Sequence, residues 1–126
     1  MWELIAPQAE DRIIFMGDYI DRGPNSKEVI DFIMDKQVHF NIIALTGNHE
    51  EKFALSEMDH TDCEGWINYW GGQPTLDSYG PKGFDDVPES HWEFIRHLKP
   101  YYETESHIFV HANLEHDVPL TEQLPF

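Results

Sequence analysis

Residues 17–23 read Gly-Asp-Tyr-Ile-Asp-Arg-Gly, a stretch with charged side chains between two glycines. A hydrophobic run over residues 13–16 leads directly into this stretch, and an apolar run bounded by glycine is typical of a buried strand. Two carboxylates and a guanidinium then follow within five positions. Polar side chains at the carboxyl end of a strand are typical of a binding or catalytic site in α/β proteins. We therefore expect a strand that ends in a site.

The same pattern, a hydrophobic run followed by polar donors, occurs at two later points. Residues 42–45 read Ile-Ile-Ala-Leu and run into Thr-Gly-Asn-His-Glu at residues 46–50. Residues 108–110 read Ile-Phe-Val and run into His-Ala-Asn at residues 111–113. We expect the three strand ends to lie along one edge of a sheet, where ligands bind in open α/β folds. Oxygen and imidazole donors gathered there would suit a metal-assisted active site.

Hydrophobic spacing predicts the elements between the first two motifs. The first strand is expected over residues 11–16 and the second over residues 40–45. Between them, Asn25 as N-cap with Glu28 three residues later marks a helix start, and apolar residues at helical spacing extend this helix to about residue 37. A strand, a helix and a second strand in this order predict a right-handed parallel crossover.

The remainder of the chain is predicted to be mainly helical, with one hairpin. We expect helices over residues 50–57, 66–70 and 90–98, an acidic loop over residues 58–64, a mainly irregular stretch over residues 74–88, and a hairpin of residues 101–102 and 107–110. The sequence shows no repeat and no domain linker. The predicted fold class is therefore α/β in one domain.

Several of these segments resemble successive motifs of the calcineurin-like metallophosphoesterase superfamily: residues 17–23, 47–50 and 111–112. The likeness is strongest to the bacterial phosphoprotein (serine/threonine) phosphatase branch, which residues 70–72 and 75–76 also resemble. The resemblance implies an α/β fold built of βαβ units, with the site at the carboxyl ends of the strands.

Three side chains are candidate metal ligands. Phosphate-ester hydrolysis is assisted by two metal ions about 4 Å apart, which polarise phosphoryl oxygens and lower the pKa of a bound water. Asp18 is the candidate bridge between two such ions, Asn48 offers a carbonyl oxygen and His111 an imidazole nitrogen. Mixed oxygen and nitrogen donors favour Mn²⁺, Fe or Zn²⁺ over Mg²⁺. We expect two divalent transition metal ions, manganese first among them. Taken singly, Asp18 and Asn48 would be turn residues and His111 a core histidine.

Three further side chains are candidate catalytic groups. A histidine beside a metal-bound phosphate can protonate the leaving alcohol, which is typically worth about 10²–10⁴-fold in rate, and His49 is the candidate for this role. Asp21 is expected to bond the other ring nitrogen of His49 and to fix its tautomer. Arg22 offers a planar fork that matches phosphate oxygens. The alternatives are a turn cap or salt bridge for Asp21 and a surface ion pair for Arg22. The resemblance implies the acid pair and the phosphate grip.

Charge and cysteine content narrow the class of protein. The 126 residues include eight Lys and Arg against 24 Asp and Glu, which gives a net charge of −16 at pH 7. Such an acidic chain is not expected to bind nucleic acid or an anionic membrane. The single cysteine, Cys63, excludes an internal disulfide and fits a reducing compartment. The sequence shows neither a signal-peptide pattern nor an apolar run of membrane-spanning length, so we expect a cytoplasmic protein.

These features predict a metal-dependent phosphomonoester hydrolase in which a metal-activated water attacks the phosphate. Asp-Arg-Gly-Pro at residues 21–24 resembles the serine/threonine protein phosphatases, whose substrate would be a phosphorylated protein or a small phosphoester. A diadenosine tetraphosphate-type hydrolase is the alternative within this class.

Relative to the resembled family, residues 1–126 form a partial calcineurin-like phosphoesterase domain, truncated at both ends. The first Asp-x-His-Gly motif and the C-terminal histidine motif are missing. One metal ion would keep Asp18, Asn48 and His111 as ligands, and the other would keep only Asp18. A non-catalytic, truncated metal-binding scaffold is therefore a second alternative.

Overall fold

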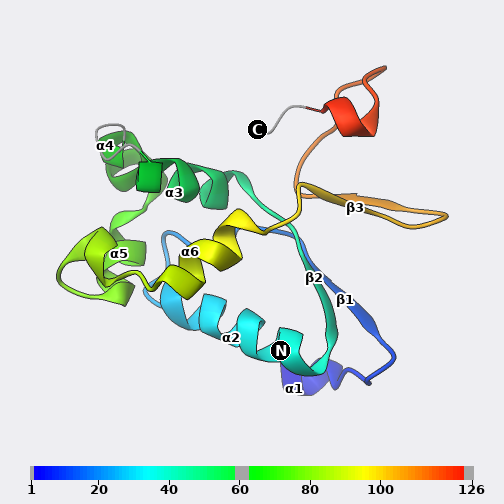
Figure 1. Ribbon diagram of the computed structural model, residues 1–126, viewed down its shortest axis with the longest axis horizontal. Helices are drawn as coiled ribbons and strands as arrows, with labels where there is room; N and C mark the ends of the chain where they lie inside the picture. The colour runs from blue at the N-terminus through cyan, green and yellow to red at the C-terminus, as the bar shows by residue number, and fades with distance from the viewer. Residues whose placement is uncertain (1, 59–62, 124–126) are drawn as a thin grey trace.

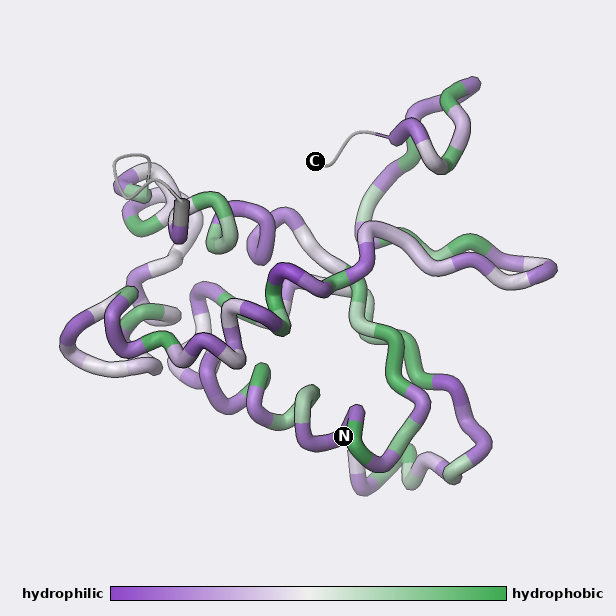
Figure 2. The backbone as a smooth tube through the Cα atoms, viewed as in Figure 1, coloured by the Kyte–Doolittle hydropathy of each residue, from purple (hydrophilic) through white to green (hydrophobic). Residues whose placement is uncertain are grey.

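A strand–helix–strand unit forms the first part of the fold (Figure 1). The computed structural model describes residues 2–58 and 63–123. Strand β1 spans Arg12–Phe15, helix α2 spans Ser26–His39 and strand β2 spans Asn41–Ala44. The two strands pair in parallel over their whole length, as the sequence predicts. They form much of the hydrophobic stretch that is green in Figure 2.

The start of helix α2 is held by a tertiary contact rather than by the predicted local cap. Asn25 precedes the helix, but its side chain makes no capping hydrogen bond, so this part of the prediction is wrong. The N–H of Lys27 in the first turn instead donates to the hydroxyl of Ser78, 3.1 Å away. Ser78 belongs to helix α5 (Gln73–Tyr79), which packs against α2.

Further helices follow β2 and agree with the predicted segments. Helix α3 spans Asn48–Met58, the π-helical turn η1 spans Trp66–Trp70, and helix α6 spans Glu89–Arg96. The predicted acidic loop over residues 58–64 lies mostly outside the described residues, and Cys63–Gly65 form the short helix α4. None of the described helices has the length and apolar character needed to cross a membrane.

Residues 74–88 differ from the prediction, which was wrong to treat them as mainly irregular. They contain most of helix α5 and the 3₁₀ helix Gly83–Asp86. Pro74 lies in the first turn of α5, where proline is tolerated because the backbone nitrogen there has no helical partner. Gly80 directly follows the last residue of the helix. Glycine and proline thus mark the ends of short helices here and do not prevent them.

The helices enclose a hydrophobic core centred on Phe53. This ring is fully buried, stacks on Trp92 with the ring centroids 4.4 Å apart, and lies 5.3 Å from Trp66. Full burial of such a side chain is worth about 1.5–3 kcal/mol. A second buried cluster joins α2 to the strands and consists of Ile33, Ile42 and Ala44. The two clusters fix α3, η1 and α5 relative to the ends of β1 and β2.

The last two strands form a hairpin that is separate from the parallel pair. Strand β3 (Tyr101–Glu103) and strand β4 (Ile108–Val110) are antiparallel, as predicted. The strands of the described chain form two two-stranded sheets, so the expectation of one continuous sheet edge is wrong. A parallel bridge between Leu45 and Lys99 joins the end of β2 to the segment before β3. The hairpin projects away from the helices in Figure 1.

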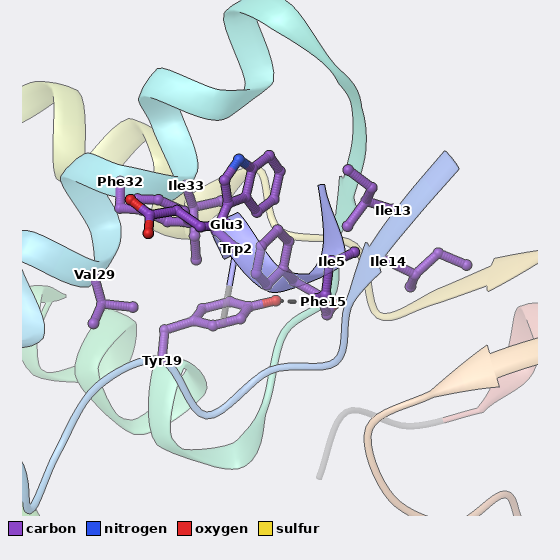
Figure 3. A pocket seen from close by; sticks show the side chains of 10 residues that line it. All are labelled: Trp2, Glu3, Ile5, Ile13, Ile14, Phe15, Tyr19, Val29, Phe32 and Ile33. Atoms are coloured by element: carbon purple, nitrogen blue, oxygen red, sulfur yellow. Dashed lines mark hydrogen bonds between the residues drawn. The ribbon is translucent and has the colours of Figure 1, made fainter. Parts of the chain in front are cut away.

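A mainly apolar cavity of about 650 Å³ lies between helix α1 (Trp2–Ile5), β1 and α2 (Figure 3). Glu3 is the one charged residue among those that line it. The Trp2 ring meets Phe32 edge-on, with the ring centroids 5.4 Å apart. The cavity includes Tyr19 of the loop after β1 and otherwise draws on residues outside the predicted site. The 3₁₀ helix Leu120–Glu122 is the last element described.

Candidate active site

The loop after β1 has an uncommon backbone conformation. The φ angle is positive at Gly17 (94°), Asp18 (58°), Asp21 (74°) and Arg22 (62°). Positive φ is uncommon for residues other than glycine, and such strained conformations concentrate at functional sites. They persist only where the surrounding structure holds them, so contacts from elsewhere in the chain must fix this loop.

The buried carboxylate of Glu50 fixes the first half of the loop. Its Oε2 accepts the N–H groups of Asp18 and Gly47, each at 2.9 Å, and its Oε1 accepts the N–H of Tyr19 at 2.7 Å. The residue is fully buried, and burial raises the pKa of this carboxyl, while the three N–H donors act in the opposite direction. One side chain in the first turn of α3 therefore ties the loop after β1 to the loop after β2.

The three predicted metal ligands meet at one point. Nε2 of His111 lies 3.2 Å from Oδ1 of Asn48 and 3.3 Å from Oδ1 of Asp18. Asp18 belongs to the loop after β1, Asn48 is the first residue of α3, and His111 directly follows β4. The carboxyl ends of three strands thus come together although they belong to two sheets.

The hydrogen bonds of His111 indicate which of its ring nitrogens carries the proton. Its Nδ1 lies 2.6 Å from the carbonyl oxygen of Met16, which only accepts, so Nδ1 carries the ring proton. In the neutral ring, Nε2 then presents a bare lone pair to the oxygens of Asn48 and Asp18. A cation between these three groups would satisfy all of them.

The donor set fits a transition metal ion. Ligand atoms about 2.0–2.2 Å from a common tetrahedral or octahedral metal lie roughly 3.0–3.5 Å apart, which includes the two distances measured here. One carboxylate, one amide oxygen and one imidazole suit a divalent metal ion. Over residues 2–58 and 63–123, no group of three or more His, Cys, Asp or Glu side chains could hold a metal ion. The cluster contributes two side chains of those types, and Asn48 is its third member.

His49 and Asp21 are in direct contact. Nδ1 of His49 lies 2.6 Å from Oδ2 of Asp21, and the two side chains are 7% and 0% exposed. An ionised carboxylate only accepts, so Nδ1 donates and Nε2 is left without a proton in the neutral ring. The ring of His49 also meets Trp70 edge-on, with the centroids 5.4 Å apart. The predicted acid is thus oriented by a fully buried partner.

Arg22 lies exposed at the end of the same loop. Its backbone N–H donates to the carbonyl of Gly71 at 2.9 Å, so the loop is fastened next to Trp70 and therefore near His49. No described residue forms an ion pair with its guanidinium. The surface ion pair considered from the sequence is therefore not seen, and the guanidinium is available to an anion.

Gly47 allows the two loops to approach each other. A Cβ at this position would overlap Oδ1 of Asp18 and lie 2.6 Å from the Asp18 backbone nitrogen. We expect Gly47→Ala to lower the free energy of unfolding by about 1–3 kcal/mol, as overpacking does, and to displace Asp18. Urea unfolding measures the first effect. Gly65→Ala is the matched control, because no atom lies within 4 Å of a Cβ there; equal effects of the two substitutions would contradict the steric argument.

Sequence reasoning gave no role to Glu50, Trp66 or Thr75, which the structure places around the site. The Trp66 indole and the Thr75 hydroxyl both donate to the carboxylate of Asp21, across separations of 45 and 54 residues. No local spacing connects residues so far apart. The one available signal was that Glu50 and Thr75 lie in segments resembling the phosphatase branch.

The comparisons with known proteins agree with this fold. The family described as calcineurin-like phosphoesterase matches residues 1–122, and the chain belongs to this family. Members of the family generally use divalent metal ions.

A more specific similarity covers part of the chain. A Caenorhabditis elegans protein, named as a "putative serine/threonine-protein phosphatase", is 36% identical over 52 residues, which is 40% of this chain. The matched segment spans 14% of that relative's length. The bacterial branch suggested by the motifs stays a prediction.

Proposed function

We propose that this chain carries the catalytic part of a metal-dependent phosphomonoester hydrolase of the serine/threonine protein phosphatase type. The observation that supports this most directly is the convergence of Asp18, Asn48 and His111, with donor atoms 3.2 and 3.3 Å apart. His49 directly follows Asn48 in the chain, and its buried pair with Asp21 supplies the second requirement of the reaction, a proton donor.

Each side chain has a distinct role in this proposal. A divalent ion held by Asp18, Asn48 and His111, for which we propose Mn²⁺, would polarise the phosphoryl group and lower the pKa of a water molecule. The guanidinium of Arg22 binds the phosphate oxygens through paired hydrogen bonds. With both ring nitrogens protonated, His49 gives its Nε2 proton to the leaving oxygen and becomes a neutral ring, which keeps the Nδ1 proton that Asp21 accepts.

The proposed substrate is a phosphorylated serine or threonine in a protein. The name of the Caenorhabditis elegans relative and the motif resemblance support this choice. Diadenosine tetraphosphate is the competing substrate, since the metal cluster and the acid pair suit either phosphoester. We also propose a cytoplasmic location, and we propose that residues 1–126 are part of a calcineurin-like phosphoesterase domain.

Turnover of defined substrates by the 126-residue chain tests the proposal. With Mn²⁺ present, we expect hydrolysis of p-nitrophenyl phosphate and of a phosphoserine peptide, and loss of both in Asp18→Ala. Faster turnover of diadenosine tetraphosphate would favour the competing substrate. Stoichiometric Mn²⁺ binding by calorimetry without turnover of any substrate would favour the non-catalytic scaffold, and neither binding nor turnover would overturn both readings.

A further inference from the structure

The carboxylate of Asp21 accepts hydrogen bonds from three side chains. Its Oδ2 accepts from Nδ1 of His49 at 2.6 Å and from the indole Nε1 of Trp66 at 2.7 Å. Its Oδ1 accepts from the hydroxyl of Thr75 at 2.7 Å. Trp66 is 3% exposed and Thr75 is completely buried, so water does not compete for these bonds. These three hydrogen bonds hold the carboxyl group of Asp21 in one orientation.

Thr75 holds both the backbone and the side chain of Asp21. Its hydroxyl oxygen accepts the N–H of Asp21 at 2.9 Å while its proton goes to the carboxylate. Ser26 lies 3.1 Å from the same oxygen and must donate to it, since the Thr75 proton is already used. Thr75 therefore helps to hold both the backbone and the carboxylate of Asp21, and Ser26 is a second acceptor of the Asp21 N–H at 3.2 Å.

The π-helical turn Trp66–Trp70 contacts both members of the acid pair. Trp66, at its first position, bonds Asp21, and Trp70, at its last position, meets the ring of His49. The Trp66 ring lies flat against Gly72, where a Cβ would come within 2.6 Å of the ring carbons. Short π-helical turns are rare and frequently occur at functional sites.

We propose that Trp66 and Thr75 are positioning residues of the His49–Asp21 pair. Their donors share the negative charge of Asp21 and fix its orientation, so that Oδ2 faces Nδ1 of His49. His49 then keeps its proton on Nδ1 and presents Nε2 outward in one tautomer. This inference rests on the proposed function only for its kinetic consequence, because the tautomer is a property of the folded chain.

The tautomer is tested by ¹⁵N NMR of the His49 ring under conditions in which the ring is neutral. In the unmodified chain we expect a single tautomer with the proton on Nδ1 and slow exchange of that proton with water. Thr75→Val keeps the shape of the side chain, Trp66→Phe keeps a smaller aromatic ring, and each removes one hydrogen-bond donor. We expect a mixture of tautomers or faster exchange in both variants, and a return to the original signal in Thr75→Ser.

Trp92→Phe is the matched control for the tryptophan substitution. Trp92 is also a buried core residue, at 6% exposure, and it packs on Phe53 without contacting the acid pair. An unchanged His49 ring in folded Trp66→Phe and Thr75→Val, or an equal change in Trp92→Phe, overturns the proposal. If Trp66→Phe fails to fold, Thr75→Val and Thr75→Ser decide the question alone.

Kinetics give a second reading that separates this inference from the proposed function. We expect kcat of Trp66→Phe and Thr75→Val to fall about 10–100-fold, as is typical when an outer partner of a site is removed, with little change in KM. The loss is larger for a phosphoserine peptide than for p-nitrophenyl phosphate, because alkoxide is the poorer leaving group. If the variants show the expected tautomer changes but the unmodified chain has no turnover, the proposed function is contradicted and the positioning role of Trp66 and Thr75 is retained. If kcat falls equally for both substrates, Trp66 and Thr75 do not position an acid.

Discussion

Replacement of His49 by Asn is expected to slow hydrolysis of a phosphoserine peptide about 10²–10⁴-fold, the range of general acid catalysis. The Asn side-chain amide can donate to Asp21 much as Nδ1 does, at the 2.6 Å contact, but it has no group at the position of Nε2. The variant therefore removes the acid with little disturbance of the buried carboxylate. Hydrolysis of p-nitrophenyl phosphate should fall much less, since its leaving group needs little protonation. Steady-state kinetics on the two substrates provide the measurement.

His39→Asn is the control for this substitution, because His39 is exposed at the end of α2. It should leave both rates unchanged. If His49→Asn slowed the two substrates equally, the role of His49 would be structural or would concern phosphate binding, and proton donation would be excluded. Unchanged rates of His49→Asn on both substrates would show that His49 neither donates a proton nor binds the phosphate.

Glu50→Ala is expected to have the largest effect on stability. It removes a completely buried carboxylate that accepts three backbone N–H groups, one in a buried and two in part-buried hydrogen bonds. An unsatisfied buried donor costs about 1–3 kcal/mol, so we expect the free energy of unfolding to fall by about 3 kcal/mol. A typical domain has only about 5–15 kcal/mol in total. Urea unfolding followed by tryptophan fluorescence measures the change.

Glu93→Ala is the matched control, since this glutamate is exposed on helix α6. We expect it to change stability by less than about 0.5 kcal/mol, as surface substitutions usually do. A Glu50→Ala variant as stable as Glu93→Ala would show that the loops after β1 and β2 hold their shape without this carboxylate, and our account of the loop would fail.

The parts of the fold that depend on local pattern were predictable from sequence. The parallel pair β1–β2, helix α2 and the hairpin follow hydrophobic runs and their spacing, and all three are present. The errors arose where a distant residue replaced a local signal. Ser78 accepts an N–H of the first turn of α2, where Asn25 was the predicted cap. Helix α5 forms between Gly72 and Gly80, where the glycine and proline residues indicated a loop.

The candidate site shows the same division. Asp18, Asn48, His49 and His111 each follow a strand, and this position, their chemistry and the family resemblance made them candidates. The contacts that hold the loop after β1 could not be predicted, because they come from Glu50, Trp66 and Thr75, which lie 31 to 54 residues from the loop residues they bind. Buried polar contacts of this kind have no periodicity in the sequence. They become visible only when the hydrogen bonds of each buried group are counted.

The hairpin that carries His111 has a consequence for how an ion would be held. Asp21 and His49 rest on the helical core, whereas His111 arrives from strands whose residues are only half-buried or exposed. Local opening of such a peripheral segment takes less free energy than global unfolding. A bound ion would join His111 to the loops after β1 and β2, and by mass action it would stabilise the closed hairpin by a free energy that rises with the logarithm of the ion concentration above its Kd. Metal depletion should therefore loosen the C-terminal strands first and leave the tryptophan-lined interior in place.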